Sequence, residues 1–220
     1  LKKKTVLNNL IFFSLGALSS LSLPPFNFFI INFFTFSMFF ILLSQKLLNK
    51  HNKKAFFFYG WLFGFGYFLT NIYWITISLT FDENFNFLIP VALITIPAFL
   101  AIFYGIVTFV FCIFNFRDVT SNFFFLSLLF GLTEYIRGTI LTGFPWNLII
   151  YSFSENINFL SFLSVIGTYS YNLLVISFFT VPAVYILRKS KKEILVCILF
   201  LLLPIFLFTY STLYKKNFQI

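Results

Sequence analysis

Apolar runs of about twenty residues recur along this 220-residue chain, which is the length a helix needs to cross roughly 30 Å of hydrocarbon. The chain is 60% hydrophobic and only 10% charged, and its mean hydropathy is +0.96. A soluble domain of this size carries far more charge. The pattern therefore predicts an all-α fold, a polytopic bundle of membrane-spanning helices.

Seven spans are expected from the apolar runs. The tight Pro24-Pro25 pair separates the first two, because proline cannot continue a helix. Small residues spaced as in Gly60 and Gly64, with Gly66 nearby, let membrane helices approach closely, so we expect these glycines to serve helix packing. The expected spans are Val6–Leu23, Phe26–Gln45, Ala55–Thr80, Leu88–Phe116, Asn122–Leu141, Asn158–Leu187 and Glu193–Tyr214.

Lysine and arginine are concentrated in alternate loops, which sets the expected orientation. The N-terminus and the loops after the second, fourth and sixth spans hold twelve of the fifteen basic residues. The opposite side carries Asp82, Glu83 and Glu155, with Lys215 and Lys216 at the tail. We therefore expect a cytoplasmic N-terminus and an extracytoplasmic C-terminus. The net charge of +9 is explained by topology, so no nucleic-acid partner is expected.

A cleaved signal peptide is an alternative for the first apolar run. Three lysines precede it, and the small residues Ala17, Ser19 and Ser20 follow its apolar core. A second apolar run begins at once, with no soluble stretch between them, which favours a retained helix. Cleavage would leave the remaining topology unchanged.

Two ionisable residues, Glu134 and Arg137, interrupt the fifth apolar run. They are three positions apart, so they share a helix face and can pair. Charges within a span are costly and usually face the protein interior or a water-filled cavity. The pair can fix helix packing, or it can anchor a lipid head group or the following loop.

A turn with the sequence Thr-Gly-Phe-Pro-Trp-Asn follows this run at its outer end. Gly143 and Pro145 break the helix, and Phe144 and Trp146 are expected at the membrane interface. The turn is either a simple connection with aromatic anchors or a loop that lines a substrate cavity. Tyr73 and Trp74, at the outer end of the third span, fit the interfacial aromatic belt, with substrate contact as the alternative reading.

The remaining reactive side chains give no catalytic or metal-binding pattern. Cys112 and Cys197 both lie inside apolar runs, and their spacing fits neither a disulfide framework nor a metal site. The single histidine, His51, falls in a lysine-rich loop that we expect to be solvated. No cofactor and no metal are expected.

Several segments resemble apolipoprotein N-acyltransferase, the last enzyme of bacterial lipoprotein maturation. The segment "LTEYIRGTILTGFPWNLIIYS" looks like that family's signature, and "YGWLFGFGYFLTNIYWITISL" resembles its third span. Further similar segments are "GALSSLSLPPFN", the turn between the first two spans, and "LSVIGTYSYNLLVISF", in the sixth. The resemblance covers essentially the whole chain, in order.

The resemblance implies a multi-pass protein of the bacterial cytoplasmic (inner) membrane, whose family transfers an acyl chain. The donor is a phospholipid of the bilayer, and the acceptor is the N-terminal diacylglyceryl-cysteine of an apolipoprotein. In the family, a periplasmic nitrilase-like domain with a Glu-Lys-Cys triad carries the chemistry. Six residues match the signature and are expected to shape the outer mouth of the lipid cavity: Glu134, Arg137, Gly143, Phe144, Pro145 and Trp146.

This chain departs from the family pattern at its end, "YKKNFQI", where the first nitrilase strand would begin. We expect residues 1–214 to form the membrane domain and residues 215–220 to start a linker or that first strand. No catalytic residue is assigned, and the chain is expected to be inactive alone, a truncated piece of an enzyme. The alternatives are a non-catalytic scaffold, a split-gene partner of a separate nitrilase-like subunit, and, with less support, a small transporter.

Overall fold

The computed structural model describes residues 2–48, 52–114, 116–140 and 143–218, and these form helices and no strand. Helices are the expected outcome, since a backbone in hydrocarbon must pair its own polar groups. The α-helices are α1 Lys2–Ser19, α2 Ile31–Leu48, α3 Lys53–Asn71, α4 Ile89–Ile113, α5 Val119–Thr139, α6 Ile157–Leu160, α7 Leu163–Ile166, α8 Thr168–Leu187 and α9 Lys191–Phe218. Four 3₁₀ helices accompany them: Ser20–Ser22, Tyr73–Phe81, Glu83–Leu88 and Ile149–Phe153.

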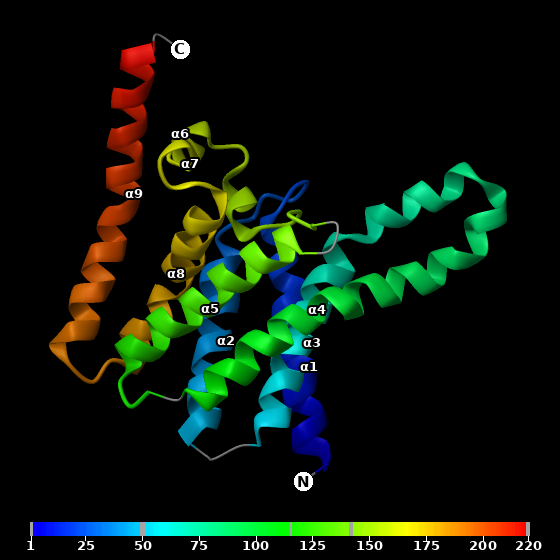
Figure 1. Ribbon diagram of the computed structural model, residues 1–220. Coiled ribbons are helices and arrows are strands. Elements are labelled where there is room, and N and C mark those ends of the chain that lie inside the picture. Colours follow the sequence, from blue (N-terminus) through cyan, green and yellow to red (C-terminus); the bar gives the residue numbers. More distant parts are fainter. Residues whose placement is uncertain (1, 49–51, 115, 141–142, 219–220) are drawn as a thin grey trace.

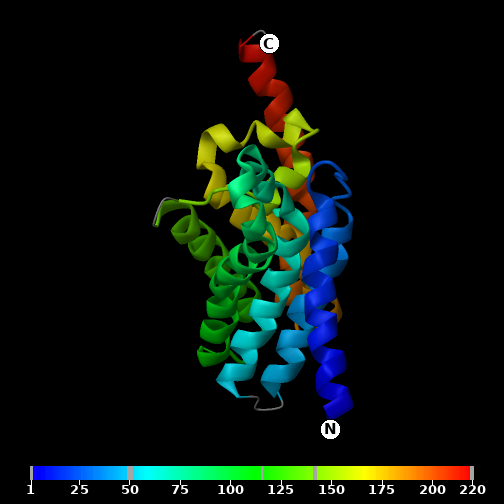
Figure 2. The same ribbon diagram turned by 90° about the vertical axis from the view of Figure 1, so that its right-hand side faces the viewer.

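The long helices run side by side as a bundle, with the N- and C-termini at opposite ends (Figure 1). Both views show the α2–α3, α4–α5 and α8–α9 connections at the end of the bundle that holds the N-terminus (Figures 1 and 2). Buried phenylalanine and tyrosine rings fill the centre, for example Phe39 against Phe63 with ring centroids 4.3 Å apart. Buried aromatic pairs of this kind add to the stability that area burial provides.

Within the described residues, five helices are long and apolar enough to cross a membrane, or six if a bent pair counts as one span. The structure therefore supports a polytopic helical bundle. The apolar part of the first helix, Val6–Ser22, is shorter than these five, so length and composition alone do not give the expected count of seven.

The expected third span, Ala55–Thr80, contains a bend. The helix α3 ends at Asn71 and the following 3₁₀ helix bends away by 48°, so the two helices form either one broken span or a span followed by a re-entrant segment. That 3₁₀ helix, the next one and the start of α4 project from one side of the bundle (Figure 1). The bend places Tyr73 and Trp74 beside Trp146, against a common cavity.

The expected start of the sixth span at Asn158 is wrong. Two single-turn helices, α6 and α7, precede Gly167, which has a φ of +77°, and the long helix α8 starts only at Thr168. A glycine adopts this left-handed backbone without steric cost, so the chain turns there. Residues 157–166 instead cap the end of the bundle opposite the N-terminus, called the outer end below (Figure 1).

The seventh expected span ends later in the structure than predicted, and the end of the fifth cannot be compared with the prediction. The helix α9 continues to Phe218, so residues 215–218 are helical, past the expected end of the membrane domain at Tyr214. The expected end of the fifth span, Leu141, lies outside the described residues, as do His51 and residues 219–220.

The glycines of α3 lie where helices touch. A Cβ atom added to Gly60 would lie 2.2 Å from the Tyr104 carbonyl oxygen of α4, and one added to Gly64 would lie 3.1 Å from Ala101 Cα. Gly66 faces α1 instead, where an added Cβ would lie 2.2 Å from the Phe13 carbonyl oxygen. The helix α3 is thus held closely by neighbours on two sides.

Replacing Gly66 by alanine is expected to destabilise the bundle by about 1–3 kcal/mol, because rigid backbone must move to admit the new methyl group. Unfolding in detergent, followed by circular dichroism, measures the effect. Gly105→Ala is the matched control, since the three atoms nearest to its added Cβ belong to the ring of Phe57, the closest at 2.8 Å, and a side chain can move more easily than backbone. An equal loss in both variants would show that the α1–α3 contact is not specially close.

Candidate site at the outer end of the bundle

The Glu134–Arg137 pair is buried in the bundle. The two side chains are 0% and 2% exposed and lie one turn apart on α5. Arg137 donates from Nε to Glu134 Oε2 at 2.8 Å and from Nη2 to the same oxygen. Tyr104, on α4, donates its hydroxyl to the other carboxylate oxygen at 2.6 Å. Both carboxylate oxygens therefore have partners, which a buried charge requires.

Arg137 also holds the turn that follows α5. Its Nη1 donates to the Phe144 carbonyl at 2.8 Å, and its Nη2 donates to the Trp146 carbonyl at 3.1 Å. The rings of Phe68 and Phe144 lie 5.2 and 5.7 Å from the guanidinium carbon, within cation–π range. Four of the five N–H donors of an arginine are thus used inside the protein.

Glycine and asparagine shape the turn itself. Gly143 has a φ of +71°, and its N–H donates to the Ile140 carbonyl at 2.8 Å. An added Cβ at Gly143 would lie 2.7 Å from the Gly138 carbonyl oxygen, so this position is strained for any other residue. Asn147 has a φ of +59°, which asparagine tolerates better than most residues.

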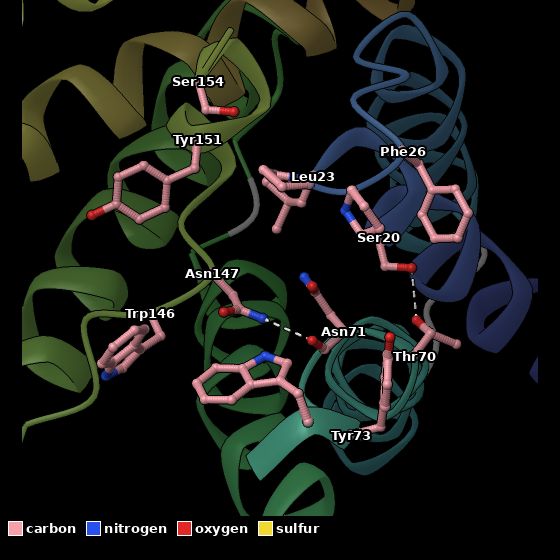
Figure 3. Close-up of a pocket in the computed structure, with 13 residues that line it drawn as sticks. Ser20, Leu23, Phe26, Thr70, Asn71, Tyr73, Trp146, Asn147, Tyr151 and Ser154 are labelled. Carbon is pink, nitrogen blue, oxygen red and sulfur yellow. Dashed lines mark hydrogen bonds between the residues drawn. The ribbon is translucent and has the colours of Figure 1, made fainter. Parts of the chain in front are cut away.

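Residues of α3 tie the turn to the rest of the bundle. The Tyr67 hydroxyl donates to the Asn147 carbonyl at 2.7 Å. The Asn147 side chain donates to the Asn71 carbonyl at 3.4 Å (Figure 3). The turn is therefore fixed from two helices: Arg137 on α5 and Tyr67 on α3.

A cavity of about 450 Å³ opens beside this turn. Its walls come from the connection between α1 and α2, the end of α3 and the segment after the turn (Figure 3). The indole rings of Trp74 and Trp146 meet across it, with centroids 5.5 Å apart. The lining residues described are Ser20, Leu23, Pro24, Pro25, Phe26, Thr70, Asn71, Tyr73, Trp74, Trp146, Asn147, Tyr151 and Ser154.

The chemistry of this wall is aromatic and polar but uncharged. None of the described lining residues carries a formal charge. Thr70 donates to the Ser20 hydroxyl at 2.8 Å, which joins α3 to the end of α1 on one side of the cavity. Trp146 is 54% exposed and stands at its mouth. Such a cavity, of a size typical for small-ligand sites, suits the uncharged portion of an amphiphile.

The predicted site residues fall into three groups in the structure. Glu134 and Arg137 are buried, Gly143 and Phe144 are half-buried, and Arg137, Gly143 and Phe144 line a smaller cavity of about 170 Å³ against α4. Trp146, with Tyr73 and Trp74, lines the larger cavity. Pro145 is exposed. The α3 glycines Gly60, Gly64 and Gly66 lie at helix contacts and do not line the larger cavity.

The sequence reading missed four partners of this site. Tyr104 and Tyr67 supply the hydroxyl groups that meet Glu134 and Asn147, Phe68 stacks on Arg137, and Tyr151 lines the cavity. A tyrosine in the middle of a long apolar run, such as Tyr104, signals a hydroxyl that needs a buried partner. No comparable signal marks Phe68 among 39 phenylalanines.

The two cysteines lie away from this cavity. Cys112 is half-buried in α4 and Cys197 is buried in α9. Neither lines the cavity walls. Within the described ranges, no three His, Cys, Asp or Glu side chains gather as metal ligands would.

Comparisons with known proteins point to one family. A family model described as "Apolipoprotein N-acyltransferase N-terminal domain" matches residues 15–181. The chain is 38% identical over 170 residues to an apolipoprotein N-acyltransferase of Rickettsia typhi, covering 76% of this chain and 32% of that protein. It is 33% identical over 186 residues to the one of Allorhizobium ampelinum, covering 80% of this chain and 34% of the relative.

A third relative, the apolipoprotein N-acyltransferase of Rhodopseudomonas palustris, is 36% identical over 173 residues, covering 78% of this chain and 32% of the relative. The chain therefore spans about a third of the length of the curated relatives it matches. The matched stretch contains the anchored turn and all the residues of the outer cavity. The chain belongs to the apolipoprotein N-acyltransferase family and matches its N-terminal domain.

Proposed function

We propose that this chain is the membrane domain of an enzyme that moves an acyl chain from a phospholipid to the N-terminal diacylglyceryl-cysteine of apolipoproteins. One observation carries the proposal. Arg137 is buried and holds the carbonyls of the turn, which leaves Trp146 exposed at an uncharged cavity with Tyr73 and Trp74. The turn is thus held by hydrogen bonds on its buried side, and its exposed side, with Trp146, borders the cavity where lipid would enter.

Acyl transfer to an amine breaks the ester bond of the donor lipid and forms an amide on the acceptor. In this proposal, the residues of this chain supply the position of the acyl chains and not the nucleophile. Aromatic side chains at the membrane interface hold the junction between tail and head group. Glu134, Arg137, Gly143, Phe144 and Pro145 act as positioning residues, because they set where Trp146 stands. The chemistry belongs to a nitrilase-like domain that follows in the same protein or is supplied by a separate chain.

The proposed topology has seven spans in the bacterial inner membrane, with α1 as the first. Its N-terminus is cytoplasmic and its C-terminus faces the periplasm. The support is the clustering of basic loops: the N-terminal lysines and the α2–α3, α4–α5 and α8–α9 connections lie at one end of the bundle (Figure 1). The cavity then opens at the periplasmic end. Residues 1–214 form the membrane domain in this account.

A domain exchange tests the function. In the Rickettsia typhi relative, the matching N-terminal part is replaced by this chain, and the chimera is produced in cells depleted of their own enzyme. The expected result is an N-acylated lipoprotein, detected by the mass of its N-terminal peptide. A chimera that reaches the membrane at normal levels, yet leaves the N-terminal amine free, would contradict the proposal. Sequencing beyond codon 220 then distinguishes a continuous enzyme from a split one.

A further inference from the structure

A small cavity lies at the end of the bundle that holds the N-terminus, and it is called the inner cavity below. It has a volume of about 100 Å³ and shares no lining residue with the outer cavity. Its walls come from the end of α2, the α4–α5 connection with the start of α5, and the end of α8 with the α8–α9 connection (Figure 1). A ligand bound here would be separate from any ligand at the outer end.

The inner cavity is lined by two cationic side chains, Arg117 and Lys189, which come from different connections. No acidic side chain is among its described lining residues. Within the part of the chain that the structure describes, neither cation takes part in a hydrogen bond or an ion pair. Two like charges at one cavity repel each other, and an anion between them replaces that repulsion by attraction. The inner cavity therefore suits a negatively charged group.

The α4–α5 connection is held on both sides of Arg117. The Asn122 side chain donates to the Phe116 carbonyl at 2.8 Å and accepts from the Phe116 N–H at 3.1 Å. Asp118 accepts from the Ser121 N–H at 2.7 Å and so caps the start of α5. The carboxylate next to Arg117 in the sequence thus serves the helix start, and Arg117 stays at the cavity without it.

The α8–α9 connection leaves Lys189 available in a similar way. The neighbouring Arg188 lies over the Tyr185 ring, 3.9 Å from its centroid, and donates to the Tyr185 carbonyl at 2.6 Å. Glu193 accepts from the N–H and the hydroxyl of Ser190, at 2.8 and 2.6 Å. One basic residue of the connection is therefore held against α8 and the nearby acid is bonded to Ser190, whereas Lys189 lines the cavity.

The rim of the inner cavity is apolar and exposed. Leu48, at the end of α2, is 78% exposed, and Phe116 is 41% exposed. The volume of about 100 Å³ is below the roughly 300–1,000 Å³ of a typical small-ligand site, so the cavity admits part of a head group and not an acyl chain. Basic pockets between membrane helices bind anionic lipid head groups. An anion with an apolar tail uses both the cations and the rim, which a free inorganic anion cannot do.

We propose that the inner cavity binds the phosphate group of an anionic bilayer phospholipid whose head group carries no cation, such as phosphatidylglycerol. Arg117 and Lys189 contact the phosphate, and the acyl chains lie along Leu48 and Phe116. A head group with an ammonium group fits less well, because it brings a third positive charge to the two cations. In the proposed topology this lipid belongs to the cytoplasmic leaflet, but the site itself does not depend on acyl transfer.

Competitive lipid titration of the full chain in detergent, read by native mass spectrometry, tests the inner cavity. The chain is expected to retain dioleoyl-phosphatidylglycerol in preference to dioleoyl-phosphatidylethanolamine. Lys189→Gln removes one cation from an exposed connection, so it should weaken phosphatidylglycerol binding about fivefold and leave phosphatidylethanolamine binding unchanged. Arg117→Gln should have an effect of similar size from the other wall, which gives the test a second, independent variant.

Lys191→Gln is the matched control for these variants. Lys191 is exposed at the start of α9, two residues after Lys189, and does not line the inner cavity. Its replacement removes the same charge and should leave the lipid preference unchanged. Equal losses in Lys191→Gln and Lys189→Gln would reveal diffuse attraction to the basic end of the bundle and would overturn the site.

Inorganic phosphate distinguishes a lipid site from a simple anion site. It shares the phosphate chemistry but has no tail to contact Leu48 and Phe116, so a large excess should leave phosphatidylglycerol bound. Displacement by inorganic phosphate would contradict the lipid assignment, and equal retention of the two lipids would contradict the charge argument. These measurements involve neither acyl transfer nor the outer cavity, so this proposal can fail while the proposed function holds.

Discussion

Replacing Arg137 by methionine is expected to lower the free energy of unfolding by about 3–5 kcal/mol, because it leaves the carboxylate of Glu134 buried without its cation. Methionine also cannot donate hydrogen bonds to the carbonyls of Phe144 and Trp146, so the turn is no longer bonded to the side chain at position 137 of α5. Equilibrium unfolding in mixed micelles, followed by circular dichroism, measures the loss. Arg117→Met serves as the control, because Arg117 is exposed in the connection between α4 and α5.

A double variant separates the ion pair from the turn. Combining Arg137→Met with Glu134→Gln removes the stranded charge and keeps an acceptor for the Tyr104 hydroxyl. The double variant should therefore be more stable than Arg137→Met alone, which is the non-additivity expected of groups in direct contact. It should remain impaired in acyl transfer in the chimeric enzyme, because the turn is still unanchored. Additive losses of stability would show that the two charges do not depend on each other.

Replacing Trp146 by alanine in the chimeric enzyme is expected to lower kcat/KM for acyl transfer about tenfold while the protein stays in the membrane. Trp146 packs against Trp74 over the cavity, and its truncation removes one wall. Because Trp146 is 54% exposed, its loss should cost little stability. Acyl transfer to a diacylglyceryl lipopeptide, followed by mass spectrometry, measures the change.

Phe87→Ala is the matched control for this prediction. Phe87 is also an exposed aromatic residue, but it lies on the projecting 3₁₀ segment and does not line the cavity. Its replacement should leave the rate of acyl transfer unchanged. Normal kinetics in Trp146→Ala at normal expression would remove Trp146 from the proposed lipid path.

The importance of the fifth span was predictable because it contains an acid and a base in an apolar run, followed by helix-breaking residues. The sequence could not show which atoms Arg137 binds. Its partners outside Glu134 are backbone carbonyls, and carbonyls of residues 144 and 146 carry no sequence signal. The contribution of Tyr67 was hidden for the same reason, since its hydroxyl also meets a backbone oxygen.

The bend in the expected third span and the late start of the sixth have a common physical cause. Apolar residues continue through the bend after Asn71 and through Gly167, so a hydropathy pattern joins segments that the backbone separates. Ile72 has a non-helical conformation, with φ −111° and ψ 15°, and Gly167 has a positive φ. Both breaks lie at the end of the bundle that holds the outer cavity, and irregular backbone at membrane depth is tolerated where it is buried in protein or lines a cavity.

Site-specific crosslinking at position 146 tests most directly whether the outer cavity is the lipid entrance of an N-acyltransferase. The chimeric enzyme carries p-benzoyl-phenylalanine in place of Trp146, or in place of Phe87 as the reference, and is irradiated in native membranes. The account predicts a phospholipid adduct at position 146 that falls when diacylglyceryl lipopeptide is added, with no such fall at position 87. A phospholipid adduct at position 146 that the lipopeptide leaves unchanged would contradict it.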